Sequence, residues 1–127
     1  MTIAEIGDAT VFTFYHCKGA AEPRAGARVE DVYEVCGQAQ KSVAWASLAR
    51  LEKRLRERRN KLFVRGTADS LRDVLTRAKD RRQVFEIKVV QPGVSKAALS
   101  APMAECLGAT NGHLAGVGAP FEMIASA

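Results

Sequence analysis

A histidine and a lysine stand two residues apart at the end of a predicted strand. Residues 11–18 read Val-Phe-Thr-Phe-Tyr-His-Cys-Lys, which is rich in β-branched and aromatic residues and is bounded by Asp8 and Gly19. Because side chains alternate between the faces of a strand, His16 and Lys18 share one face. Asp8 is expected across a hairpin that joins this strand to a shorter one before it. Ligands of open α/β sheets bind at strand ends, so we predict a site here.

A polar stripe on the following helix is expected to face this strand end. Glu30, Glu34, Gln38 and Lys41 are spaced by four, four and three residues, so they share one helical face. If this helix packs beside the strand, Glu34 and Gln38 approach the histidine and the lysine. Hydrolysis of a phosphodiester requires such a meeting of lysine and carboxylates around a divalent metal ion, because the cations stabilise charge on the phosphate. The alternative is a pair of solvent-facing side chains without chemistry.

The elements that must position these residues alternate between strands and helices. Besides the strand over 11–18, we expect a helix over 29–58 that bends near Gly37, a strand over 61–66, a helix that begins near Thr67 or Asp69, a strand over 84–90, a helix over 101–114 and an edge strand over 120–124. This order predicts an α/β fold, with a mixed central sheet flanked by helices. The length of 127 residues predicts a single domain.

Basic residues concentrate in the middle of the chain. Residues 50–82 contain thirteen Lys or Arg and five Asp or Glu, whereas the other residues have a net charge of −3. A basic segment of this kind is typical of a surface for a polyanion. The expected nucleic-acid contacts are Arg50, Lys53, Arg54, Arg56, Arg58, Arg59 and Lys61. Trp45 is the only aromatic residue between Tyr33 and Phe63, which argues against a stacking platform for a single strand and favours contact with the phosphate backbone. The alternative is a solvated, salt-bridged helix face.

Residues 5–42 resemble the core of a nuclease superfamily. Asp8, the strand that ends in His-Cys-Lys, a glycine-bearing loop and the helix that begins Val-Glu-Asp-Val-Tyr-Glu are similar to the PD-(D/E)xK nucleases, and most of all to Mrr-like restriction endonucleases. The resemblance implies a restriction-endonuclease-like core that hydrolyses DNA with Mg²⁺ or Mn²⁺ in restriction or anti-phage defence. It also implies that Asp8 binds the metal, that Lys18 is the catalytic base or a transition-state cation, and that Gln38 supports the site. The rest of the chain, including 84–127, matches only in the order of its elements.

The chain departs from this superfamily at position 16, where a second metal-binding acid is expected and His16 stands instead. Three outcomes are open. His16 binds the metal itself, or Glu34 supplies the missing carboxylate, or the domain is catalytically inactive and serves DNA binding or protein assembly. Imidazole suits Mn²⁺ better than Mg²⁺, which prefers oxygen ligands. Asp8 is also close to the start of the strand and could lie in the turn, so Glu5 is the alternative ligand.

Composition excludes several other classes of protein. Three Cys are too few for a disulfide scaffold, and no apolar run approaches the roughly 18 residues of a membrane span. The first eight residues carry two acids and no base, unlike a secretory signal. We therefore expect a cytoplasmic protein without membrane contact, in which Cys17 and Cys36 are core residues. A second copy of the chain, or other domains of a larger defence protein, are expected partners besides DNA.

Overall fold

The computed structural model describes residues 1–18, 28–58 and 62–126. Its strands are β1 (Thr2–Ile6), β2 (Ala9–Cys17), β3 (Arg82–Ser95) and β4 (Phe121–Ser126). Its α-helices are α1 (Val29–Lys41), α2 (Leu48–Glu57), α3 (Ala68–Arg77) and α4 (Ala101–Gly116). Short 3-10 helices lie between them at η1 (Ser42–Trp45), η2 (Ala78–Asp80) and η3 (Lys96–Ala98).

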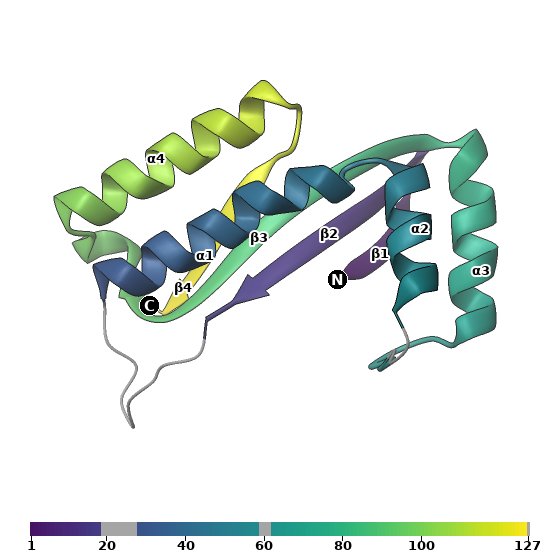
Figure 1. Cartoon of the computed structure of the whole chain (residues 1–127), viewed down its shortest axis with the longest axis horizontal. Coiled ribbons are helices and arrows are strands. Elements are labelled where there is room, and N and C mark those ends of the chain that lie inside the picture. Colours follow the sequence, from purple (N-terminus) through teal and green to yellow (C-terminus); the bar gives the residue numbers. More distant parts are fainter. Residues whose placement is uncertain (19–27, 59–61, 127) are drawn as a thin grey trace.

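In the part of the chain that the structure describes, four strands form one mixed sheet in the order β1-β2-β3-β4. β1 and β2 form an antiparallel hairpin, whereas β2, β3 and β4 run parallel. Parallel neighbours need a crossover connection. The helices α1, α2 and α3 lie between β2 and β3 in the chain, and α4 lies between β3 and β4 (Figure 1). The predicted α/β class with a mixed central sheet is therefore confirmed.

The larger core lies between the sheet and the helices α1 and α4. Val32 and Val35 of α1, Leu114 of α4 and Ile87 and Val89 of β3 are all buried there. Burial of a side chain of this size contributes roughly 1.5–3 kcal/mol each to folding. This core holds α1 beside the parallel strands, which is the placement that the candidate site requires.

A second core lies under α2 and α3, at the start of β2. Phe12 of β2 is fully buried there with Leu51 of α2 and Leu75 of α3. The ring of Phe12 stacks on Phe85, its partner on β3, with 4.9 Å between the ring centroids. On the opposite face of the sheet, side chains such as Tyr15 are exposed, so the helices cover the face that carries Phe12.

The prediction of one helix over 29–58 is wrong, because α1 ends at Lys41 and α2 begins at Leu48. α1 continues through Gly37 without interruption, so the helix does not end at this glycine. The break falls at Ser47, whose hydroxyl accepts a hydrogen bond from the backbone N–H of Arg50 and so caps α2. The break allows α1 to pack on the larger core while α2 packs on the second core.

Three other predictions need correction. Residues 62–66 form no strand, and Lys61 lies outside the described residues; the side chains of Leu62 and Val64 are exposed. The third strand runs past residue 90 to Ser95, through Gly93 with φ +81° and a shift in its register with β4. Cys17 is exposed and not a core residue, because it ends β2 on the uncovered face of the sheet.

The remaining elements were predicted correctly. The hairpin partner before β2, the helices near 67 and over 101–114, and the edge strand over 120–124 are confirmed as β1, α3, α4 and β4. Cys36 is buried, as expected. The hairpin turn itself lies at Gly7 and Asp8, where Gly7 has φ +55°.

Candidate functional site

Five polar side chains meet where β2 ends beside α1: His16, Lys18, Glu34, Gln38 and Ser42, called here the Lys18 cluster. Lys18 Nζ donates to Glu34 Oε2 at 2.6 Å, and Gln38 Nε2 donates to Glu34 Oε1 at 3.4 Å. Glu34 and Gln38 are four residues apart on α1, so both side chains project from one face of the helix. The structure therefore brings Lys18 together with Glu34 and Gln38, as the spacing predicted.

The imidazole of His16 is held by a serine that the sequence analysis missed. Nε2 of His16 and Oγ of Ser42 lie 2.5 Å apart, and Ser42 Oγ donates to the backbone carbonyl of Gln38 at 3.2 Å. The tautomer of His16 decides whether Nε2 or the hydroxyl supplies the hydrogen of this contact. Ser42 continues the four-residue spacing of Glu34 and Gln38, and this continuation was the signal that could have found it.

Burial keeps the His16 imidazole neutral. Its pKa lies below the usual value, chiefly because desolvation disfavours the charged ring and secondarily because the N-terminal amine repels it. The pKa of Lys18 is raised instead, since the carboxylate of Glu34 accepts a hydrogen bond from the ammonium group. The cluster therefore offers one neutral imidazole and one cation, which a carboxylate already balances.

The two acids assigned to a metal by resemblance lie at the other end of β2. Asp8 sits in the turn before β2 and accepts hydrogen bonds from Arg82 at 3.2 and 3.3 Å. Glu5 accepts from Arg77 at 2.9 and 3.0 Å. A strand rises about 3.3 Å per residue, so ten residues of extended chain separate Asp8 from Lys18 by about 30 Å. The expectation that Asp8 or Glu5 shares a site with His16 is therefore wrong.

These arginine contacts also define the charge state of the two acids. Hydrogen bonds from Arg82 lower the pKa of Asp8, and hydrogen bonds from Arg77 lower the pKa of Glu5. Both carboxylates are thus ionised partners that tie β1 and its turn to the region around η2 and β3. Asp8 and Glu5 therefore form ion pairs with Arg82 and Arg77.

The Lys18 cluster does not by itself form the two-carboxylate metal site that the resemblance implies. Glu34 is its carboxylate, and both oxygens of Glu34 already accept hydrogen bonds from Lys18 and Gln38. The nitrogen Nε2 of His16 is engaged by Ser42. Within residues 1–18, 28–58 and 62–126, no three His, Cys, Asp or Glu side chains are grouped so that they could hold a metal ion.

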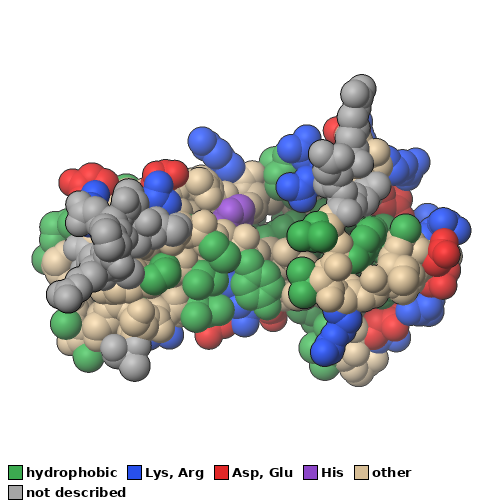
Figure 2. Space-filling model, turned by 90° about the horizontal axis from the view of Figure 1, so that it is seen from below, with side chains coloured by type: hydrophobic (Ala, Val, Ile, Leu, Met, Phe, Trp, Pro, Cys, Tyr) green, Lys and Arg blue, Asp and Glu red, His purple; other side chains and the backbone are tan. Residues whose placement is uncertain are grey.

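Basic side chains gather on α2, as predicted. Arg50, Lys53, Arg54 and Arg56 lie on this helix, Arg58 follows it, and all five are exposed. Among the described residues, only Arg56 of these five forms an ion pair, with Glu52 at 3.4 Å. Two other predicted contacts, Arg59 and Lys61, lie outside the described residues. Figure 2 shows Lys and Arg side chains gathered at the end of the molecule that carries α2 and α3.

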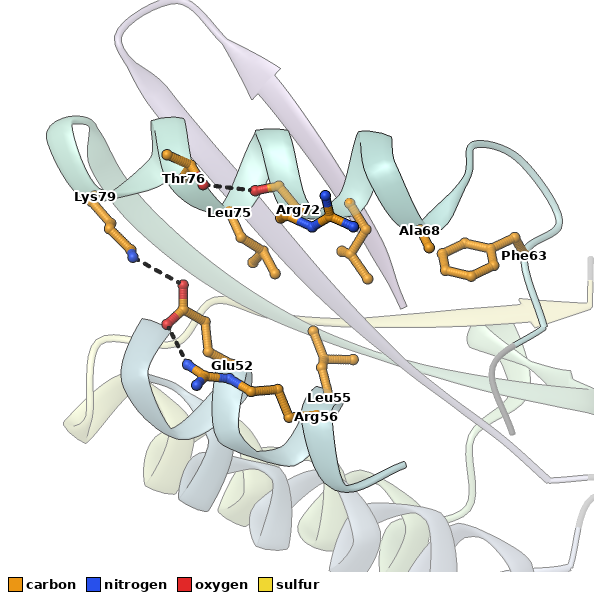
Figure 3. Close-up of a pocket in the computed structure, with 10 residues that line it drawn as sticks. Glu52, Leu55, Arg56, Phe63, Ala68, Arg72, Leu75, Thr76 and Lys79 are labelled. Carbon is orange, nitrogen blue, oxygen red and sulfur yellow. Dashed lines mark hydrogen bonds and ion pairs between the residues drawn. The ribbon is translucent and has the colours of Figure 1, made fainter. Parts of the chain in front are cut away.

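A groove of about 420 Å³ separates α2 from α3 (Figure 3). Leu55 of α2 and Leu71 and Leu75 of α3 line its apolar floor. At its rim, Glu52 is paired with both Arg56 and Lys79, at 3.4 and 3.6 Å. The residues that line this groove include none of the Lys18 cluster.

Comparisons with protein-family models, with curated proteins and with solved structures found no match. In the described part of the chain, no helix has the length and apolar character needed to cross a membrane.

Proposed function

We propose that this chain is a DNA-binding domain that holds the phosphate backbone with the cations of α2. The observation that carries the proposal is a surface of four exposed side chains, Arg50, Lys53, Arg54 and Arg58, none of which pairs with an acid among the described residues. A phosphate backbone supplies the missing negative charges. Release of the counterions that surround DNA then drives association.

The placement of acids elsewhere supports this proposal. Asp8, Glu5 and Glu34 are each engaged by Arg or Lys, so they do not cancel the charge of α2. Residues 50–82 have a net charge of +8, and the whole chain has +5. Like charges held this close on one helix repel one another and cost stability. Such a cost is tolerated on a surface whose role is to meet a polyanion.

The binding test compares two charge reversals of the same residue type. Lys53→Glu removes a cation from α2, whereas Lys96→Glu makes the same change of net charge on η3. The affinity for a fluorescein-labelled 20-bp duplex is measured by anisotropy at low salt. We expect Lys53→Glu to weaken binding about tenfold and Lys96→Glu to change it little, since each phosphate contact contributes separately. Equal losses in the two variants would refute a specific role for α2.

A second candidate function is metal-dependent cleavage of DNA in restriction or anti-phage defence. The specific observation in its favour is that Lys18, Glu34 and Gln38 meet at the carboxyl end of a parallel strand, where α/β proteins place their ligands. The hairpin β1–β2 is followed by a parallel crossover from β2 to β3 that contains α1, α2 and α3. For this candidate, Glu34 and His16 would have to exchange their contacts with Lys18, Gln38 and Ser42 for Mg²⁺ or Mn²⁺.

Nicking of supercoiled plasmid tests this second candidate. The protein is incubated with plasmid in Mg²⁺ and in Mn²⁺, and the open-circle product is followed on a gel. Nicking that is lost in both Lys18→Ala and Glu34→Gln would support cleavage. Salt-sensitive binding without nicking by the wild-type protein would leave DNA binding as the function.

A further inference from the structure

The single tryptophan of the chain belongs to neither core. Trp45 is the largest type of side chain, yet 36% of it is exposed, and it packs into neither the larger core nor the second core. Its ring is covered instead by a cation: Cζ of Arg54 lies 5.2 Å from the ring centroid. Part of the Trp45 side chain therefore stays accessible to a ligand beside the guanidinium of Arg54.

Trp45 stands between the two polar features of the molecule. It ends η1, which begins at Ser42, the partner of the His16 imidazole. Three residues after Trp45, α2 begins, and this helix carries the cations proposed to hold phosphates. A strand of DNA that follows the α2 cations toward the Lys18 cluster therefore passes this ring.

We infer that Trp45 and Arg54 form a stacking contact for one unpaired nucleobase, so that the preferred partner is DNA with an unpaired base beside a duplex. This inference rests on the proposed DNA-binding function. Every base has a π-face that can stack on an indole ring, without regard to sequence. The planar guanidinium of Arg54 can stack on an aromatic face and donate to a phosphate at the same time.

One unpaired base fits these residues better than a long single strand does. A single-strand platform needs a series of rings along a groove. Here Trp45 is the only aromatic residue between Tyr33 and Phe63. The bases of an intact duplex are stacked on one another and cannot reach the ring. The contact thus selects a base that is already out of the stack, while the α2 cations hold the flanking phosphates.

The test uses the fact that the chain has one tryptophan. Two unlabelled 20-bp duplexes are compared, identical except that one carries a single bulged thymine. We expect the bulged duplex to quench the emission of Trp45 and to bind about tenfold more tightly than the perfect duplex. The perfect duplex should bind through α2 and leave the emission nearly unchanged.

Two substitutions complete the experiment. Trp45→Leu should abolish the preference for the bulged duplex, and Trp45→Phe should retain part of it, with affinities measured by anisotropy. The perfect duplex should bind both variants as tightly as the wild type, which also shows that they are folded. Equal affinity and equal emission for the two duplexes overturn this inference alone. If neither duplex binds at low salt, the proposed DNA-binding function is overturned as well.

Discussion

Protonation of the His16 imidazole costs more free energy in the folded chain than protonation of a free histidine does. It is half-buried at the end of β2, and its Nε2 is bonded to the buried Ser42 hydroxyl. Desolvation therefore holds its pKa below the ordinary value of about 6.5. At a pH between the lowered pKa of the folded state and the ordinary pKa of the unfolded state, the unfolded chain binds a proton at His16 that the folded chain does not bind. Stability must then rise with pH across this interval.

We predict that the free energy of unfolding decreases as the pH is lowered from 7.5 through 6.5 toward the folded-state pKa of His16. The stabilisation due to the neutral imidazole is present in full above about 6.5 and is lost below it. Denaturant titrations of the wild type and of His16→Gln measure the effect. The variant should lose this part of the pH dependence. Parallel pH profiles for the two proteins would contradict the assigned burial.

Glu34 is the residue that separates the two candidate functions. It balances Lys18 through a contact of 2.6 Å. If the chain only binds DNA, Glu34→Gln releases the lysine for a phosphate, so affinity should rise and the salt slope should steepen by about 0.9. Glu105→Gln on α4 is the control, because it makes the same change of charge on another helix. If the chain cleaves DNA, Glu34→Gln should instead abolish nicking.

At the scale of elements, local signals predicted most of the strands and helices. β-branched and aromatic residues identified β2, weak alternation identified the first part of β3, and apolar spacing with a capping threonine identified α3. The break between α1 and α2 was missed because apolar spacing continues across it. What decides the break is the existence of two separate cores, which no local pattern reveals. Residues 62–66 have strand composition without a neighbouring strand to pair with.

The N-terminus of α3 provides a test at this scale. Thr67 accepts a hydrogen bond from the backbone N–H of Ser70 at 3.1 Å, and Ser70 Oγ accepts one from the backbone N–H of Thr67 at 2.7 Å. We predict that Thr67→Ala lowers the free energy of unfolding by about 1 kcal/mol, because the backbone N–H of Ser70 loses its side-chain acceptor. Thr67→Ser keeps the hydroxyl and should cost little. Equal denaturation midpoints for the alanine and serine variants would contradict a role for the cap.

At the scale of the whole molecule, sequence spacing could predict which residues share a helix face but not the strand register. It brought Glu34 and Gln38 to Lys18 correctly, because residues four apart on α1 must project together. Asp8 could not be placed in the same way. It pairs with Arg82, which is distant in sequence and reaches Asp8 only through the parallel pairing of β2 with β3. Long-range pairing of this kind carries no local signature.

Charge is unevenly distributed over the molecule. Thirteen of the nineteen basic residues lie in 50–82, and the other residues are acidic on balance. Such an asymmetry orients the α2 end of the molecule toward a polyanion before contact, and it does so more strongly at low salt. In the proposed complex, the surface of four cations, Arg50, Lys53, Arg54 and Arg58, sets how many phosphates are engaged.

The salt dependence of duplex affinity tests this account most directly. If four cations each neutralise a phosphate, log K should fall against log salt with a slope of about −3.6, and the affinity should drop roughly 100-fold between 50 and 200 mM NaCl. Anisotropy titrations of a labelled 20-bp duplex at several salt concentrations give this slope. A slope near zero, or no binding at 50 mM, would contradict the claim that α2 holds the DNA backbone.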